Sequence, residues 1–595
     1  MPGGFTFLLE VFVPTLNWLG KDAVLNHHLD VPYRTLELKE SFNCESGQSE
    51  NKIIHGDNLE ALKALLPEYE GRVKCIYIDP PYNTGEENWV YNDNVNSPKI
   101  KKWLGQVVGK ESEDLTRHDK WLCMMYPRLM LLQKLLSKDG VIFISIDDNE
   151  QANLKLICNE IFGAENFEGC IHWRRRHNQP NDKAKLIGLV AEFILVYANN
   201  SKRLKECGVG KIPLTGNFSN PDNDPKGDWA SKPWKAGIGQ GGSNYDIKSP
   251  DGQIFKETWL GDEKTYQQLL ADGRIYFPKS RNGKLGTPRK KYYRFEREEE
   301  GQSATNWWSH EMAGCNQDAA DEIKAIFCEN TNQKIFDTPK PSSLIEKIIS
   351  LGNDKNGIFL DSFAGSGTTA HAVLNMNKQD GGNRKFILVE MEDYADSITA
   401  ERVRRVIKGY KADKKIELYS KEMTVNDLKN ASDFLEEIKC IREERREEFS
   451  SFKTEFENNT LKLYGVAKGD EEGTGGDFNF YELGPEMIHD GNLNERQSVE
   501  KIRSYIYYTE TGTPIDKEKV KESKHEFFLG DFDNTAYYLF YKKKEITTLD
   551  FDFLSTIQIL SERYVIYADN CVLPKDFLFE HNITFKKIPR DVRKF

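Results

Sequence analysis

Residues 75–85 read CIYIDPPYNTG. The first four residues are apolar and predict a buried strand, whereas the two prolines after Asp79 cannot continue one. Each proline fixes its own φ and lacks an amide donor, and the residue before a proline is held extended. The stretch therefore predicts a rigid turn at the carboxyl end of a strand, the edge where open α/β sheets bind ligands.

The chemistry of this turn suits a planar base that carries an exocyclic amine. The carboxylate of Asp79 and the carbonyl of Pro80 can both accept hydrogen bonds from an amino group, and the ring of Tyr82 can stack on the base. An amine held by two acceptors loses conjugation with its ring and becomes a better nucleophile. We therefore predict a catalytic turn made of Asp79, Pro80, Pro81 and Tyr82; the alternative is a structural proline turn with an incidental acid.

A second informative stretch, residues 357–370, reads GIFLDSFAGSGTTA. It predicts a strand, a glycine loop and a helix, and the next strand ends in Glu390, where a Rossmann-type acid binds ribose hydroxyls. The pattern also fits a nicotinamide or flavin nucleotide site. However, the third glycine of a dinucleotide site is missing, because the loop continues as Gly367-Thr368-Thr369. This favours a cofactor without pyrophosphate, such as S-adenosylmethionine.

Strands and helices alternate on either side of these stretches. Strands are predicted at 52–55, 141–146, 170–173 and 192–197, and helices after Asp57, at 118–136 and after the sequence TPKP at 338–341. This alternation indicates an α/β fold with a largely parallel sheet. Asp57 lies at a strand-to-helix junction, so it is a helix N-cap, a ligand contact, or both.

A chain of 595 residues exceeds a single core and predicts several domains. We expect a lead-in at 1–50, a catalytic half at 51–200, a separate unit at 201–330, a cofactor half at 331–410 and a C-terminal part at 411–595. The unit at 201–330 is rich in Gly, Pro, Asn and Trp. Residues 429–456 predict a charged helix that contacts an oligomer or partner, and 477–595 predict a small mixed α/β domain.

The net charge of −12 argues against a uniformly basic nucleic-acid binder, but two local runs are basic. A run at 172–177 and another at 279–294 interleave bases with aromatic residues. A basic run is often only a solvated face; we favour nucleic-acid contact. The predicted contacts are Arg174, Arg175, Arg176, Arg289, Lys290, Lys291 and Arg294.

The ten cysteines are scattered without a Cys-x-x-Cys pair or zinc spacing. This predicts reduced thiols, no metal site and a cytoplasmic location. The apolar leader at 5–19 contains Glu10 and Pro14 and lacks a basic start, so neither a signal peptide nor a membrane span is expected. None of the cysteines has a nucleophile-like setting, which argues against carbon-5 cytosine chemistry.

Taken together, the motifs resemble the amino-type DNA methyltransferases, and most closely the modification (Mod) subunits of type III restriction-modification systems. The catalytic turn precedes the cofactor loop with a recognition region between them, an order similar to the circularly permuted beta class. The resemblance rests on DPPYNTG at 79–85, HGDNLE at 55–60, FAGSGTT at 363–369 and TPKP at 338–341.

This resemblance implies a Rossmann-like S-adenosylmethionine-dependent methyltransferase sheet with an inserted target-recognition domain and a C-terminal mixed α/β domain. It implies methyl transfer to the N6 amine of a flipped adenine in double-stranded DNA. A homodimer and a restriction (nuclease and helicase) subunit are the implied partners. Ala191 precedes Glu192 where a histidine is common in the family. The implied cofactor-binding residues are Asp57, Thr338, Lys340, Asp361, Phe363, Gly365, Gly367, Thr368 and Glu390.

Three alternatives stay open at this point. Cytosine N4 is also an exocyclic amine, although relatives of that kind more often carry serine at the first position of the motif, so Asp79 favours adenine. A catalytically silent DNA-specificity subunit is disfavoured by the intact Asp79 and Tyr82. An RNA or protein methyltransferase would differ in the polymer that accepts the methyl group.

Overall fold

The computed structural model describes residues 15–44, 49–84, 105, 116–179, 186–212, 214, 218–280, 282–327, 335–423, 427, 431–457, 459–489 and 491–589. The chain divides into two compact units. Gly210–Thr305 forms the smaller one, which we call the inserted unit. The segments on either side of it form the main unit.

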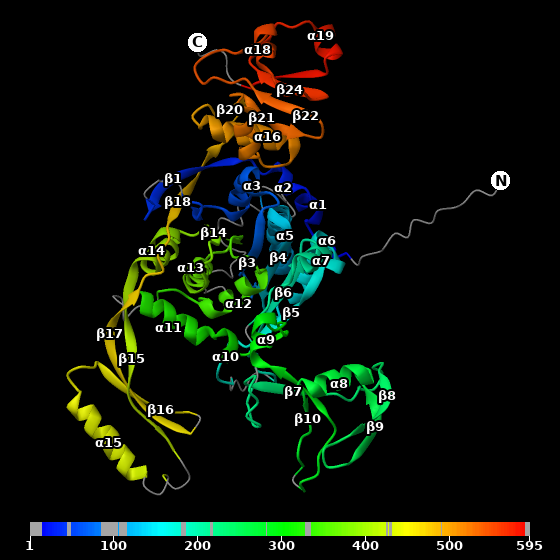
Figure 1. Cartoon of the computed structure of the whole chain (residues 1–595). Coiled ribbons are helices and arrows are strands. Elements are labelled where there is room, and N and C mark those ends of the chain that lie inside the picture. Colours follow the sequence, from blue (N-terminus) through cyan, green and yellow to red (C-terminus); the bar gives the residue numbers. More distant parts are fainter. Residues whose placement is uncertain are drawn as a thin grey trace, which may run out of the picture. The chain divides into compact units, whose positions relative to one another are not determined.

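The described part of the main unit is built on a ten-stranded sheet (Figure 1). From β18 to β4 all neighbouring strands are parallel, whereas β1 and β6 join antiparallel. The expectation of a largely parallel sheet is therefore confirmed. In spatial order the strands are β1 (Arg34–Phe42), β18 (Phe478–Glu486), β2 (Lys52–His55), β14 (Lys385–Glu390), β13 (Ile358–Asp361), β3 (Val73–Ile78), β4 (Leu136–Ile146), β6 (Glu192–Ala198), β5 (Phe167–Trp173) and β12 (Trp307–Trp308).

Helices cover both faces of the central strands, which is why β3 is buried along its whole length and apolar except for Lys74. On one face α3 (Asn58–Tyr69), α5 (Arg117–Leu135) and α6 (Gln151–Phe162) share a core with the strands. On the other, α12 (Ser342–Gly352) packs against β3 and α13 (Thr368–Asp380) packs against β14. A capping box between Thr116 and Asp119 starts α5.

The order of strands places the two informative stretches side by side. β3 and β13 are parallel neighbours, with Ile76 opposite Leu360. The chain passes from β3 to β4 on one side and from β13 to β14 on the other. Connections that leave in opposite directions make a crevice at the carboxyl ends of the two strands. Asp79 and the glycine loop both stand at this crevice.

Three predicted boundaries differ from the structure. The lead-in at 1–50 supplies β1, and β18 comes from the predicted C-terminal domain, yet both are strands of the main sheet. The compact inserted unit is shorter than 201–330, because β12 pairs with β5 and α11 (Asn316–Ile326) packs against α14 (Glu401–Lys408). Composition changes along the chain do not reveal such long-range pairings.

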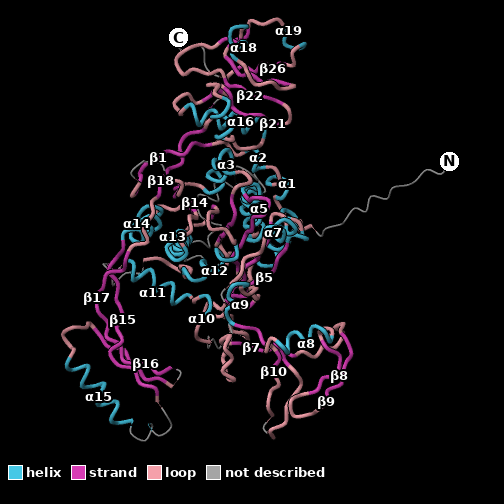
Figure 2. The backbone as a smooth tube through the Cα atoms, viewed as in Figure 1, coloured by secondary structure: helices cyan, strands magenta, loops and turns pink. Residues whose placement is uncertain are grey.

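The charged segment at 429–456 is also not one helix. It forms α15 (Ala431–Glu444) and then β16 (Ser451–Glu457), which joins β17 (Thr460–Glu472) and β15 (Gly409–Glu422) in an antiparallel sheet (Figure 2). Phe452, Thr454 and Phe456 alternate with charged residues, a strand period that the helical interpretation overlooked.

The inserted unit contains two small sheets. The first joins β10 (Ile275–Tyr276), β11 (Arg289–Tyr293) and β7 (Trp229–Pro233), and the second is the hairpin of β8 (Ser243–Lys248) and β9 (Ile254–Trp259). α8 (Glu263–Ala271) contributes Tyr266 to a core with Trp234, Ile247, Phe255 and Trp259.

The chain ends in a mixed α/β part, as expected. Its four-stranded sheet packs with α16 (Val499–Thr511), and Tyr508 of that helix reaches the core of the main sheet. Within the described residues, no helix combines the length and the apolar character needed to cross a membrane. The four strands are β21 (Phe528–Phe532), β22 (Thr535–Leu539), β24 (Arg563–Ala568) and β26 (Ile583–Lys587).

Candidate active site

Hydrogen bonds to Trp121 and Glu150 hold the turn after β3 in place. The carbonyl of Pro81 accepts a hydrogen bond of 2.6 Å from the indole of Trp121 on α5. The amide of Asn83 donates to the buried carboxylate of Glu150 at 2.5 Å. Asn83 has a positive φ of 59°, a conformation that asparagine tolerates better than most residues. These contacts orient the turn so that Asp79 is only partly buried at the crevice.

A lysine from the TPKP motif binds the catalytic turn directly. Lys340 Nζ lies 2.8 and 2.7 Å from the two carboxylate oxygens of Asp79, and 3.0 Å from the hydroxyl of Tyr82. Burial alone would lower the pKa of Lys340, but the carboxylates of Asp79 and Glu192 outweigh it and raise the pKa. The ammonium therefore stays charged although its side chain is 9% exposed.

Glu192 is a second carboxylate in this cluster, and sequence reasoning gave it no role. The hydroxyl of Tyr82 donates to Asp79 at 2.8 Å and lies 3.1 Å from Glu192 Oε2. Burial, together with both carboxylates, raises the pKa of Tyr82 well above its ordinary value, so the hydroxyl remains a donor. The sequence offered one indication of this role, because Glu192 is the first residue of the strand predicted at 192–197. In the structure that residue lies at the crevice edge, since β6 runs antiparallel to β4.

Arg175 forms an ion pair beside the catalytic turn. Its guanidinium pairs with Glu192 Oε1 at 2.9 Å, behind the catalytic turn. This charge balances a buried carboxylate, and a direct DNA contact by Arg175 stays a prediction. Arg174 is half-buried and donates to the carbonyls of Arg176 and His177, whereas Arg176 is exposed.

The glycine loop after β13 has the backbone that its sequence requires. Gly365 and Gly367 have φ of 52° and 79°, in the left-handed region that favours glycine. A Cβ on Gly367 would approach the carbonyl of Thr399 to 2.9 Å. Close packing on Thr399, rather than close approach to a ligand, is thus what this position demands.

The loop and the catalytic turn share one pocket with about 340 Å³ of space, part of it open to solvent. Thr338 lines it with a φ of 48°, which is rare for a β-branched residue and typical of constrained functional sites. Six of the nine predicted cofactor residues line this pocket; Asp57, Gly367 and Glu390 do not. The lining residues are Tyr77, Asp79, Phe336, Thr338, Pro339, Lys340, Asp361, Phe363, Ala364, Gly365, Ser366, Thr368 and Thr369.

Asp57 and Glu390 have structural partners instead. Asp57 caps α3 by accepting hydrogen bonds from the amides of Leu59 and Glu60, which confirms the N-cap interpretation. The carboxylate of Glu390 accepts from the amides of Gly365 and Glu392 at 2.8 and 3.0 Å. Glu390 therefore supports the glycine loop; ribose binding by Glu390 and ligand contact by Asp57 stay predictions.

Two buried carboxyl groups beside the loop have raised pKa values. Burial raises the pKa of Asp361 to about 7, although its oxygens accept from Thr369 and from the amide of Phe363. Burial likewise raises the pKa of Glu390 to about 7. A cationic ligand in the pocket would favour the ionised form of Asp361, which lines it.

A fully buried arginine behind the loop was not anticipated. Arg402 of α14 donates to Ser366 at 3.0 Å and to Thr368 at 2.8 Å, and it pairs with Glu322 of α11 at 2.9 Å. Thr368 in turn donates to the carbonyl of Lys340 at 3.1 Å. Arg402 thus links the glycine loop to the segment that carries Lys340.

The basic side chains of β11 in the inserted unit have more ion-pair and hydrogen-bond partners than the sequence indicates. Lys291 is buried and binds Asp222 and Asp224 at 2.5 and 2.6 Å, and its role as a DNA contact stays a prediction. Arg289 bonds to the side chain and carbonyl of Ser231 at 2.8 and 2.9 Å. The remaining two predicted contacts are Lys290, which lies over the ring of Tyr292, and Arg294, which pairs with Glu298 on the exposed surface.

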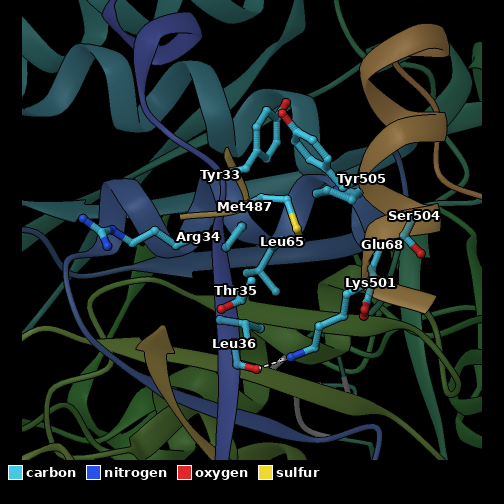
Figure 3. A pocket seen from close by; sticks show the side chains of 12 residues that line it. Tyr33, Arg34, Thr35, Leu36, Leu65, Glu68, Met487, Lys501, Ser504 and Tyr505 are labelled. Carbon is cyan, nitrogen blue, oxygen red and sulfur yellow. Dashed lines mark hydrogen bonds between the residues drawn. The ribbon is translucent and has the colours of Figure 1, made fainter. Parts of the chain in front are cut away.

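A second hollow, with about 500 Å³ of space, lies among β1, α3 and α16 (Figure 3). Lys501 reaches into it and donates to the carbonyl of Leu36 at 2.5 Å. Tyr33, Tyr505 and Met487 form its apolar wall. None of its lining residues comes from the catalytic turn or the glycine loop, so we assign the chemistry to the crevice.

An acidic proline turn and a glycine loop on adjacent parallel strands define an α/β enzyme of the Rossmann-like methyltransferase class. The chain belongs to the DNA methylase family, whose sequence model (N6_N4_Mtase) matches residues 73–401. This match begins at β3 and ends at the start of α14, so it spans the catalytic turn, the inserted unit and the glycine loop.

Curated relatives agree with this assignment. The chain is 38% identical over 404 residues to the type III restriction-modification enzyme StyLTI Mod subunit of Salmonella typhimurium, covering 63% of this chain and 59% of that relative. It is 31% identical to the EcoP15I Mod subunit of Escherichia coli, covering 64% of each. It is 30% identical to the type II methyltransferase M.KpnI of Klebsiella pneumoniae, covering 60% of this chain and 83% of that relative. The chain thus matches less than two thirds of the length of both Mod subunits.

Proposed function

We propose that this chain transfers a methyl group from S-adenosylmethionine to the N6 amine of an adenine flipped out of double-stranded DNA. We further propose that it acts as the modification subunit of a restriction-modification system, with a restriction subunit as partner and a homodimer as its assembly. The observation that carries the proposal is the carboxylate of Asp79, which stands next to Tyr82 and lines the pocket of the glycine loop.

The acceptors of Asp79 leave room for a target amine. A carboxylate offers about four acceptor positions. Among the described residues, Lys340 takes one on each oxygen and the hydroxyl of Tyr82 takes one on Oδ1, which leaves one on Oδ2. An amine that donates to Oδ2 and to the carbonyl of Pro80 is held with its nitrogen toward the pocket. The same oxygen can accept the proton that the amine loses.

The side chains that line the pocket suit the charge and the apolar parts of S-adenosylmethionine. When bound, this cofactor supplies a methyl group on a positively charged sulfur, which is already activated for transfer. Phe336 and Phe363 would pack on its apolar parts, and Asp79 and Asp361 favour its positive charge. Alignment of the amine with the methyl group then supplies catalysis without a covalent protein intermediate. Base flipping is required because a paired amine lies inside the duplex.

The test is methyl transfer from labelled S-adenosylmethionine to DNA, followed by nucleoside analysis of the product. We expect N6-methyladenine at one short sequence, formed about 10²–10³-fold more slowly by the Asp79→Ala variant. N4-methylcytosine would support the second candidate, since both bases offer an exocyclic amine. Cofactor binding without transfer to any DNA would identify a silent specificity subunit, and label on RNA or protein would contradict the DNA substrate.

We also propose that the inserted unit reads the DNA sequence. The main unit already accounts for the pocket and the catalytic turn, and Arg289, Lys290 and Arg294 retain exposed or half-exposed basic groups. A phosphate contact replaced by alanine should weaken binding to cognate and random duplexes alike and reduce the salt slope by about one. An arginine bound to guanine should lose about 1–3 kcal/mol on the cognate duplex alone. Unchanged affinity and salt slope in all three variants would contradict this role.

A further inference from the structure

The end of β5 and the start of β6 lie at the same edge of the sheet as the catalytic turn, and residues 174–179 and 186–191 continue from them. β4 is parallel to β3, and β6 is antiparallel to β4, so the start of β6 lies beside the carboxyl end of β4. β5 ends at Trp173, which is paired with Glu192 at the start of β6. The contact between Glu192 and Tyr82 places the start of β6 within the active site.

The segment that leads into β6 is apolar and exposed. Residues 186–189 read LIGL, and we call them the apolar arm. The side chains of Leu186, Ile187 and Leu189 are 100%, 71% and 45% exposed. Three large aliphatic side chains displayed within four residues are typical of a surface that is covered when the protein binds its partner.

Residues 174–177, which follow β5, read RRRH, and we call them the basic arm. Arg176 is exposed, and its backbone amide donates to the carbonyl of Val190 at 3.3 Å, directly after the apolar arm. His177 is exposed beside it. A partner that matches both arms therefore offers an anionic group next to an apolar surface.

Double-stranded DNA has both properties at the point where a base leaves the helix. Its phosphates attract the basic arm, and the gap left in the base stack is an apolar slot between two base pairs. Aliphatic side chains inserted between base steps are a general means of keeping duplex DNA open. The slot would lie next to the catalytic turn, because the flipped base must reach Asp79.

We propose that the apolar arm is a wedge that enters the duplex at the target base pair and fills the space of the extruded base, while Arg176 contacts the adjacent phosphate. This inference rests on the proposed methylation of a flipped base. In this proposal Leu186 and Ile187 lower the free energy of the opened base pair, and the catalytic turn carries out the methyl transfer.

The experiment compares the unmodified chain with the Leu186→Ala/Ile187→Ala variant on two duplexes that carry the methylated sequence. In one duplex the target base is normally paired, and in the other it faces an abasic position, so that it is already free to leave the stack. Unpairing a base costs a few kcal/mol, so we expect the variant to lose roughly tenfold or more in methyl-transfer rate on the paired duplex. On the second duplex its rate should return to within roughly threefold of the unmodified chain, by the same argument.

Leu560→Ala is the matched control, because Leu560 is 96% exposed and belongs to the C-terminal part of the chain. It should leave both rates unchanged, and all three proteins should melt at the same temperature. Equal losses on the two duplexes, or none on either, would overturn the wedge; the latter is expected if the apolar arm docks another protein. An unmodified chain that methylates neither duplex overturns the proposed function itself.

Discussion

Two buried lysines in this chain have nearly the same chemistry but different surroundings. Lys340 lies within 2.8 Å of both oxygens of Asp79 and 3.6 Å from Glu192. Lys291 lies within 2.6 Å of Asp222 and Asp224. In each case two carboxylates outweigh the effect of burial and raise the pKa of the lysine.

The difference lies in what else the carboxylates can bind. Asp222 also accepts from the indole of Trp229, and Asp224 from the hydroxyl of Tyr293, so the pair around Lys291 stabilises its own small sheet. Asp79 lines a pocket, and among the described residues it accepts three of the about four hydrogen bonds that a carboxylate can take. A buried ion pair therefore indicates function only where a pocket gives one of its members access to a ligand.

The sharpest test of this comparison is Asp79→Ala. We expect the rate of methyl transfer to fall by about 10²–10³-fold, as when one preorganised polar group is removed from an active site. Cofactor affinity, measured by calorimetry, should weaken only modestly because the glycine loop remains. A near-normal turnover in a single-turnover assay would exclude the proposed role of Asp79.

Replacing each lysine by methionine tests whether its ion pair serves the stability of the fold or the reaction. Lys291→Met leaves two carboxylates without their counter-charge, which should destabilise the inserted unit by about 3 kcal/mol. Thermal melting should detect this loss, while cofactor affinity stays at the value of the unmodified chain. Lys340→Met should lower cofactor affinity and transfer rate. If both variants lost only stability, Lys340 would be as structural as Lys291.

Two buried arginines offer a finer comparison. Arg402 donates to the glycine loop, whereas Arg384, just before β14, pairs with Asp380 at the far end of α13. Arg402→Lys removes hydrogen bonds of a charged group, and we expect about a tenfold loss of cofactor affinity. Arg384→Lys should lower the melting temperature alone. A loss of affinity in both variants would show that destabilisation, rather than loop positioning, is responsible.

The pH dependence of stability tests the surroundings of Glu390. Its pKa is raised from 4.5 to about 7 by burial, so between these pH values the folded chain holds a proton that the unfolded chain has released. Stability should therefore fall as pH rises through this range, by up to about 1.4 kcal/mol per pH unit. Glu390→Gln cannot titrate and lacks this contribution.

Melting temperatures of the unmodified chain and Glu390→Gln from pH 5 to 8 would measure it. The unmodified chain should become less stable relative to the variant as pH rises toward 7. His371, whose pKa is lowered to about 4 by burial, acts in the opposite direction but is present in both proteins, so it cancels in the difference. A difference independent of pH would contradict the raised pKa of Glu390.

The sequence by itself determined the parts of this protein whose geometry is set by neighbouring residues. The prolines after Asp79 impose a turn, and the glycines at 365 and 367 allow a backbone that other residues avoid. The alternation of strands and helices indicated the parallel sheet, and six of the nine predicted cofactor residues line one pocket. All of these follow from local backbone chemistry and periodicity.

Only the tertiary structure decided which distant charges meet. Glu192 joins Tyr82 across 110 positions of sequence, and Arg402 reaches the glycine loop from a later helix. The basic run around Lys291 indicated a DNA contact, and only the fold showed that Asp222 and Asp224 lie beside it. A buried charge is stable only with its partner, and strand order and helix packing choose that partner over long separations that no local pattern records.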